Sequence, residues 1–437
     1  MSNPIFIARQ DTLEQEILPA HWLSQYKLFG EESYTFQDKE IWKKLCMSRA
    51  AANDRDMHAE ALEEMLTTFS AEHTGKWMLL ICGLDAAVLE GLATMAAIAA
   101  NGTAMAAVAD NALLMHAITN SQTAMRAITN SQTAMRAIAN SQTAMQRIAN
   151  STTAMDAIGG SKIARSAVQA SPYYNSYIKE NDMTIAKLVV SFANLASAGY
   201  SGMAGVAADA TAMNAVAASS TAMNAVAASS VARNAISASP YYDATIKEND
   251  MAIAKLVVGF ANLESARYSG CAGMAADSTA MTAVAASSTA MTAVAASGVA
   301  LKAIAQAYKK TANMLQFLKA VNASDTLVKR IYSTLTNATA LFGAAQLGSQ
   351  DGVESANSWA TTSAASNAFL ACACGYYSSG GSSVNVTYNG TVIAQNKTGT
   401  RQPGSVTSTN VNAITMAPST FTENGDGWLA VQKFTAK

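Results

Sequence analysis

The sequence predicts a mainly α-helical protein with a helical N-terminal head, a repetitive shaft of short helices (a decapeptide solenoid) and a small C-terminal all-β domain. Three observations support this fold class. A decapeptide such as SQTAMRAITN (121–130) recurs at fixed phase through the middle of the chain. The segment IKENDMTIAKLVVSFANL (178–195) returns almost unchanged at 246–263. Beyond Gly375 the helical pattern gives way to alternating apolar and polar residues.

Each decapeptide is expected to form one short helix. Alanine and methionine favour helix over strand. Ten residues at about 100° each would turn the apolar face by roughly 80° per repeat, so one continuous helix fits badly. Pairs such as Asn130-Ser131 suit a helix end, because Asn tolerates the left-handed conformation and Ser caps the next helix. We therefore predict helices of about eight residues joined by two-residue corners.

The apolar patch of each decapeptide must be buried, because a two-turn helix is unstable alone in water. In the second repeat this patch contains Met135 and Ile138, and we expect it to pack against neighbouring repeats. One position of the repeat varies among polar residues and is expected to face water. Its members are Arg126, Arg136, Gln146, Asp156, Asn214, Asn224, Thr282 and Thr292. The sequence leaves open whether one chain or several intertwined chains build the shaft.

The repeats and the changes in composition divide the chain into six predicted segments. The head differs from the rest because it holds most of the Trp, His and charge-rich sequence. The segments are an attachment head (1–90), a decapeptide shaft (91–170), two copies of a larger shaft module (171–238 and 239–305), a helical linker region (306–375) and a β tip (376–437).

Charge and composition argue against a nucleic-acid partner, a signal peptide, a membrane span and disulfide bonds. The 29 basic and 30 acidic residues nearly cancel, which predicts no nucleic-acid partner. The first residues carry charges early, so a signal peptide is not expected. The apolar stretch 77–100 contains Asp85 and Glu90, so a packed helix is favoured over a membrane span. The five cysteines are expected as reduced thiols.

We find no pattern that supports catalysis. His58 and Glu60 imitate the H-x-E of zinc deaminases, but no P-C-x-x-C follows. With Glu63 and Glu64 they are better explained as a solvated helix face. Cys372-Ala-Cys374 has too short a spacing for the usual metal motifs. We therefore predict a protein that is not an enzyme, with no catalytic, cofactor-binding or metal-binding residues and no cofactor.

The C-terminal region carries a strong hairpin signal. Asn389-Gly390 separates two alternating runs, and segments 406–416 and 427–436 read as further strands. Aromatic side chains on this tip could stack on sugars, but a small β domain needs most of them in its core. The candidates are Tyr376, Tyr377, Tyr388, Phe421 and Trp428.

A unique head, a shaft of Ala/Ser-rich Thr-Ala-Met decapeptides over about 95–305 and a Gly/Ser/Thr-rich β tip together resemble tailed-bacteriophage fibre and whisker proteins. The resemblance implies a structural virion protein, made in the host cytoplasm, that acts in host attachment as a tail fibre, short fibre or collar whisker. It implies a homo-oligomer, expected as a homotrimer, held to other virion proteins by its head. The tip would contact a host glycan, a receptor or a virion protein.

Two other classes of function stay open. A bacterial surface adhesin would share the repetitive stalk and tip, but should carry a secretion or anchoring signal. The other class is a fibre-borne glycan-binding or depolymerase module. A depolymerase should show paired carboxylates on a β-helix, whereas this shaft is rich in Ala and Met.

Overall fold

The computed structural model describes residues 95–307, 311–351, 357–360, 367–376, 381–399, 405–416, 419–425 and 427–437. These residues are mostly helical and end in a small antiparallel β region. They belong to two compact units, one ending at Gly205 and one running from Val206 to Lys437. The predicted head, residues 1–90, lies outside the described residues.

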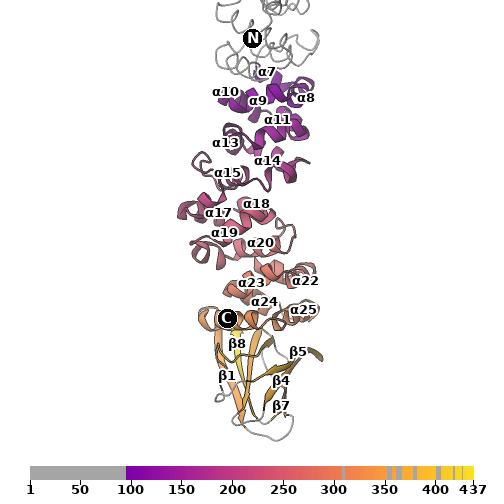
Figure 1. Cartoon of the computed structure of the whole chain (residues 1–437), viewed down its shortest axis with the longest axis vertical. Helices are drawn as coiled ribbons and strands as arrows, with labels where there is room; N and C mark the ends of the chain where they lie inside the picture. Colours follow the sequence, from indigo (N-terminus) through magenta and orange to yellow (C-terminus); the bar gives the residue numbers. More distant parts are fainter. Residues whose placement is uncertain are drawn as a thin grey trace, which may run out of the picture. The chain divides into compact units, whose positions relative to one another are not determined.

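In the first unit, the decapeptides between residues 101 and 170 each form one helix of eight or nine residues (Figure 1). A shorter helix precedes them, and a π-helical turn and a longer helix follow. The elements are α7 (Met95–Ala100), α8 (Gly102–Asp110), α9 (Ala112–Asn120), α10 (Gln122–Thr129), α11 (Gln132–Asn140), α12 (Gln142–Ala149), α13 (Thr152–Gly160), α14 (Lys162–Ala170), η3 (Tyr174–Ile178) and α15 (Asp182–Phe192).

One or two residues separate these helices. The predicted two-residue corner occurs at Asn130-Ser131 and Asn150-Ser151, and a single extended Ser or Asn separates the other pairs. Ser131, with φ −103° and ψ 117°, is the N-cap of α11, and its Oγ accepts the amide N–H of Ala134 at 3.2 Å. The predicted left-handed Asn is wrong: Asn130 has φ −88° and ψ −7°, and Asn140 is the last residue of α11. Where a single residue separates two helices, it suffices because its cap side chain already satisfies a free amide of the next helix.

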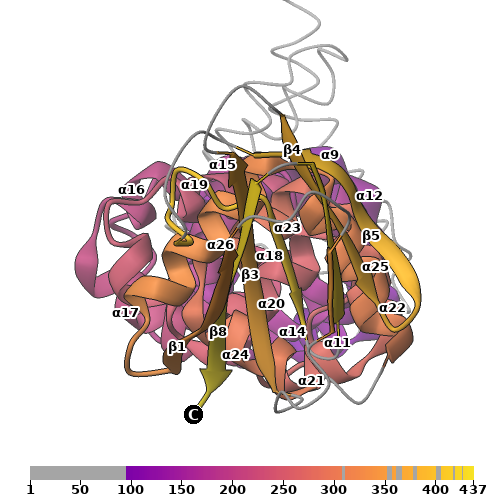
Figure 2. The same ribbon diagram turned by 90° about the horizontal axis from the view of Figure 1, so that it is seen from below.

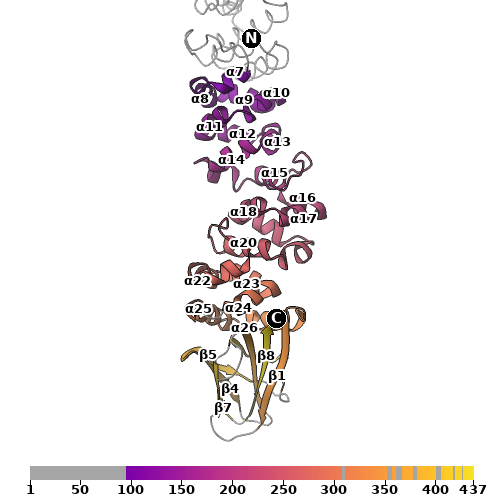
Figure 3. The same cartoon turned by 180° about the vertical axis from the view of Figure 1, so that it is seen from behind.

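The same serines link helices that are three repeats apart. The Oγ of Ser141 donates to the carbonyl of Ala109 at 2.8 Å, a residue 32 positions earlier. Ser151 donates to Thr119 and Ser161 to Thr129 in the same way, both at 2.6 Å. Accordingly, α8, α11 and α14 pack one after another along one side of the unit, and α7, α10 and α13 along another (Figures 1 and 3).

The interior of the first unit is built from the methionine and isoleucine series. Met125, Met135, Met145, Ile128, Ile138 and Ile148 are fully buried. Arg126, Arg136 and Gln146 are exposed, which confirms the predicted phase of these repeats.

The second unit begins with the same decapeptide helices and ends in strands. Helix α16 (Met203–Ala207) contains the boundary between the units. The elements that follow are α17 (Ala210–Ala218), α18 (Ser220–Ala228), α19 (Ser230–Ser237), η4 (Asp243–Lys247), α20 (Asp250–Phe260), α21 (Cys271–Ala276), α22 (Ser278–Ala286), α23 (Ser288–Ala296), α24 (Gly298–Gln306), α25 (Thr311–Asn322) and α26 (Asp325–Asn337).

A glycine permits a close contact between two helices in each module. The glycine lies on the earlier helix in one module and on the later helix in the other. In the first unit α13 packs on α15, and a Cβ at Gly159 would lie 2.2 Å from the Oγ of Ser191. In the second unit α18 packs on α20, and a Cβ at Gly259 would lie 2.8 Å from the Cα of Ala227. Positions 159 and 227 correspond in the two modules, as do 191 and 259. One side of the contact must therefore be glycine, and either helix can supply it.

Two four-stranded antiparallel sheets form the end of the second unit (Figure 2). One sheet has the order β1-β8-β3-β6 and the other the order β2-β7-β4-β5. The strands are β1 (Phe342–Asp351), β2 (Asn357–Ala360), β3 (Ala368–Tyr376), β4 (Ser382–Tyr388), β5 (Thr391–Thr398), β6 (Ala413–Met416), β7 (Ser419–Gly425) and β8 (Gly427–Ala436).

The boundary predicted at residue 376 is wrong, because three strands precede it. The β region begins at Phe342, so residues 306–375 are not a purely helical linker. Periodicity missed β3 because seven of its residues, Ala368–Cys374, are all buried and therefore show no alternation. The predicted hairpin at Asn389-Gly390 is confirmed: φ is 45° and 76° at these residues, between β4 and β5.

Met135→Ala is expected to lower the free energy of unfolding by about 2–5 kcal/mol, because it opens a cavity at a fully buried site. The matched control Arg136→Ala changes an exposed neighbour and should alter it by less than about 0.5 kcal/mol. Denaturant titration followed by circular dichroism measures both. Equal losses would contradict the assigned phase.

Gly259→Ser is expected to destabilise the second unit by about 1–3 kcal/mol, because the new side chain meets the α18 backbone at Ala227. Adding Ala227→Gly recreates the Gly/Ser pair of the first unit and should recover part of the loss. A double-mutant cycle of unfolding free energies measures this coupling. Strict additivity of the two changes would show that the contact does not select glycine.

Candidate functional site: the buried lysine centres

A buried lysine lies at the centre of each module's long helix. Lys187 on α15 is 1% exposed and Lys255 on α20 is fully buried. Both helices begin at an Asn cap, and most of their residues are buried on every side. A lysine is almost never buried unless its ammonium group has partners. The two polar environments therefore form the strongest candidate sites among the described residues.

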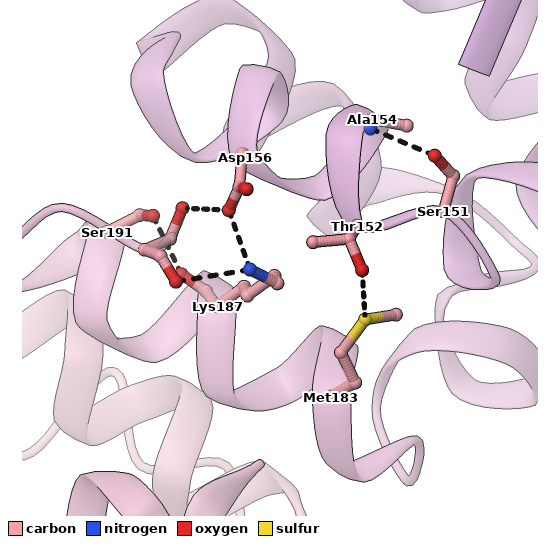
Figure 4. A network of polar contacts seen from close by, with 8 residues as sticks. Ser151, Thr152, Ala154, Asp156, Met183, Lys187 and Ser191 are labelled. Carbon is pink, nitrogen blue, oxygen red and sulfur yellow. Dashed lines mark hydrogen bonds and ion pairs between the residues drawn. The ribbon is translucent and has the colours of Figure 1, made fainter. Parts of the chain in front are cut away.

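In the first unit the ammonium group is neutralised by a carboxylate (Figure 4). Lys187 Nζ lies 2.8 Å from Oδ1 of Asp156 and donates to the carbonyl of Ser197 at 3.2 Å. The hydroxyl of Ser197 donates to the same Asp156 oxygen at 2.7 Å. Asp156 comes from α13, so the ion pair joins two helices of the shaft.

In the second unit the same geometry contains no carboxylate. Lys255 Nζ donates to Oδ1 of Asn224 at 2.7 Å and to the carbonyl of Ser265 at 3.0 Å. The Ser265 hydroxyl donates to Asn224 Oδ1 at 3.0 Å. An amide oxygen thus occupies the place of the Asp156 carboxylate. Burial lowers the pKa of Lys255 below its ordinary value, because desolvation disfavours the charged form.

A left-handed residue brings the serine carbonyl to the lysine in both modules. Helix α15 ends before Asn194 (φ 60°), and the amide of Leu195 donates to the carbonyl of Val190 at 2.9 Å. Asn262 (φ 56°) ends α20 with the same pattern. These bonds form a Schellman motif, which reverses the chain direction. The residues that follow then reach back over the helix to Ser197 or Ser265.

An acidic residue anchors the end of the same loop. Oδ1 of Asp182 accepts the amide of Met203 at 2.9 Å, and Oδ1 of Asp250 accepts the amide of Cys271 at 3.0 Å. The residue before each amide is glycine, and a Cβ at Gly202 would lie 2.2 Å from Asp182 Oδ2. The helix, its C-terminal reversal and the returning loop therefore enclose the lysine.

These centres correct one sequence-based expectation. Asp156 and Asn224 belong to the position expected to face water, yet both are half-buried and bonded to a lysine. Sequence reasoning missed the lysines as well. The available signal was a lysine inside the apolar run Ile-Ala-Lys-Leu-Val-Val, placed identically in both copies.

Such a centre binds helices together through an ammonium group that is closed to solvent. Each ammonium group is surrounded by oxygen acceptors of its own chain, and its side chain is closed to solvent. A catalytic lysine needs access to a substrate. We assign both centres a positioning role in the packing of the module helices.

The remaining candidates from the sequence are two cysteines and the acidic cluster around His58. Cys372 and Cys374 are buried and free, and burial raises the pKa of Cys374 to about 12, which keeps the thiol protonated. No group of three or more His, Cys, Asp or Glu that could hold a metal occurs among the described residues. His58, Glu60, Glu63 and Glu64 lie outside them.

The tip aromatics contribute mainly to the core. Tyr388, Phe421 and Trp428 are at most 2% exposed. Tyr376 is half-buried, and Tyr377 lies outside the described residues. Stacking of sugars on the three buried rings would require the β region to open.

No protein-family model and no curated protein matches this chain. Among the helices that the structure describes, no single one is long and apolar enough to cross a membrane. Helices α22 and α23 pass that test only together, with a bend of 105° between them.

Asn224→Asp is expected to raise the free energy of unfolding by about 1 kcal/mol at neutral pH, because a charge-assisted bond replaces a neutral one at Lys255. Lys255 has a lowered pKa in the folded protein, so wild-type folding releases a proton between that pKa and its ordinary 10.5. The buried charge of Lys255 therefore lowers the wild-type free energy of unfolding by its full amount below this pH window. This destabilisation disappears as the pH rises through the window.

The stability advantage of Asn224→Asp should therefore shrink as the pH rises toward 10.5. Denaturant titrations of both proteins across this pH range measure their free energies of unfolding. In the difference between variant and wild type, the contributions of the other titrating groups cancel. A difference that grows with pH would contradict the assignment.

Proposed function

We propose that this chain is a non-enzymatic structural component of a tailed-phage virion. Its shaft is an α-solenoid of decapeptide helices that holds two ends at a fixed spacing. The N-terminal head attaches to other virion proteins, and the C-terminal β region contacts a receptor or a neighbouring virion protein. The chain acts as a homo-oligomer. The resemblance of the decapeptides to phage fibre and whisker repeats supports this role.

The repeated serine link is the observation that carries the proposal. Each link joins a helix start to a carbonyl 32 residues earlier, and it recurs from Ser131 to Ser171 and again at Ser239. These links join neighbouring parts of the array, as expected of a repeat protein. An array of this kind lengthens in proportion to the number of repeats, which suits a spacer.

The lysine centres support the same role. Each lysine lies on a helix that is longer than the decapeptide helices. The lysine still bonds to an earlier helix, as Lys187 does to Asp156. Each lysine side chain is enclosed by residues of the same chain. Such an enclosed centre suits a rigid spacer better than a reactive site. Rigidity is what a projecting virion fibre requires.

Deleting residues 1–76 is expected to abolish incorporation of the chain into particles while leaving a soluble helical shaft, because the head is the proposed attachment surface. Complementation of a phage lacking the gene, followed by detection of the chain in purified virions, measures this. Circular dichroism of the deleted protein is the control for folding.

Deleting residues 342–437 removes both sheets and should leave incorporation intact while altering adsorption or assembly. Because α24, α25 and α26 pack on these strands, solubility of the truncated chain must be checked. If the head-deleted chain enters particles and the tip-deleted chain does not, the proposed polarity is wrong.

A further inference from the structure

A cavity of about 400 Å³ opens on the second unit where four helices meet. Its lining residues come from the ends of α19 and α20, from one side of α23 and from α26. Helix α20 packs on α19 and on α23, and α23 packs on α26 (Figure 1). Small-molecule sites have volumes of about 300–1,000 Å³, so this cavity is large enough to enclose a ligand.

The interior of this cavity offers apolar surface to a ligand. The half-buried rings of Tyr242 and Phe260 line it, together with Ala293 and Ala296 of α23. The two alanines leave space beside the rings. The Phe260 ring is already supported by the guanidinium group of Arg233, which lies 5.7 Å from the ring centre. The aromatic wall is therefore in place without a ligand.

Side-chain hydrogen bonds fix the helices around the cavity. Ser287, the N-cap of α23, donates its hydroxyl proton to the carbonyl of Phe260 at 2.9 Å. Thr334 of α26 donates to the carbonyl of Ala295 on α23 at 2.7 Å. Arg330 lies one helical turn before Thr334, and residues four apart share a helix face. The bond of Thr334 therefore holds Arg330 beside α23, where it lines the cavity.

Two polar groups at the cavity lack partners. Among the described residues that line it, Arg330 alone is charged, and it is exposed with no ion pair or hydrogen bond to a described residue. A free guanidinium group matches a carboxylate with two parallel hydrogen bonds. The hydroxyl of Tyr242 has no partner among the described residues either. Burial and the charges of Asp243 and Glu248 raise the pKa of Tyr242 to about 12, so this hydroxyl stays a hydrogen-bond donor.

The two carboxylates near Tyr242 have partners of their own. Glu248 accepts two backbone amides at the start of α24, at 3.0 and 3.1 Å. Asp243 lies 3.5 Å from the ammonium group of Lys247. Neither carboxylate lines the cavity. The positive charge of Arg330 is therefore left for a ligand.

We propose that this cavity binds a small amphipathic monocarboxylate of the fatty-acid class. Its carboxylate pairs with Arg330, and its apolar body packs against Tyr242 and Phe260. Burial of apolar surface stabilises the body, and charge-assisted hydrogen bonds to the guanidinium group stabilise the carboxylate. Inorganic phosphate would gain nothing from the apolar interior, and a neutral sugar would leave the cation unpaired. The site is independent of the proposed virion role.

The first test compares octanoate with 1-octanol, which has the same chain length and no charge. Isothermal titration calorimetry of the full-length chain measures both affinities. We expect octanoate to bind at a single site, about ten-fold more tightly than 1-octanol, because hydrogen bonds to a charged group are stronger than those between neutral groups. Failure of octanoate to bind, or equal affinities for the two compounds, overturns the proposal.

Substitutions then assign the binding to this cavity. Arg330→Gln should lower the affinity for octanoate about ten-fold and leave that for 1-octanol unchanged. The matched control Lys329→Gln removes a charge from an exposed residue that does not line the cavity, and it should change neither affinity. Ala296→Phe fills the cavity and should abolish the binding of both compounds.

Circular dichroism checks that the variants remain folded, and the comparison of Arg330→Gln with Lys329→Gln decides the matter if Ala296→Phe does not fold. Equal effects of these two charge-removing substitutions overturn the proposal. Octanoate binding that survives in folded Ala296→Phe overturns it as well.

Discussion

In the first unit, the packing of the decapeptide helices depends on one side chain that makes two hydrogen bonds. From Ser131 to Ser161, each repeat serine accepts an amide of the helix that it begins and donates its hydroxyl proton to a carbonyl 32 residues earlier, as Ser141 does with Ala144 and Ala109. The first bond ends the extended link and starts the helix. The second bond satisfies a carbonyl near the end of a helix that lies earlier in the sequence. This carbonyl would otherwise lack a partner. Helix length, corner and stacking therefore follow from the same hydroxyl group, and the buried Met and Ile pack inside the arrangement that it sets.

The two larger modules show what tandem copies can exchange without losing their geometry. The close contact between helices uses Gly159 with Ser191 in one module and Ala227 with Gly259 in the other. The lysine partner is Asp156 in one and Asn224 in the other. In both cases the spatial requirement persists while the residue that meets it changes. Burial lowers the pKa of Lys255, whose side chain donates to the neutral oxygens of Asn224 and Ser265.

The β region gains its core from helices as well as from its own strands. A β unit of this size is marginal alone, but α24, α25 and α26 contact strands β1, β3, β5, β6 and β8. Tyr332 on α26 donates to the carbonyl of Val406 at 2.8 Å and packs edge-on against Phe434. Strand β3 is buried on both faces as a result. Its cysteines are therefore core residues, with thiols that stay protonated.

The sequence by itself determined the helical decapeptides, their serine caps, the buried phase of Met135 and Ile138 and the turn at Asn389-Gly390. All of these depend on contacts within a few residues, so local propensity and periodicity suffice to predict them. Tertiary structure decided the rest. Asp156 and Asn224 have the local pattern of solvated residues, and only the arrival of Lys187 or Lys255 from a later helix gives them partners. Strand β3 has no alternation to read because both faces are covered. The carbonyl partners of the serines lie 32 residues away, and only the packing of helices three repeats apart brings them into contact.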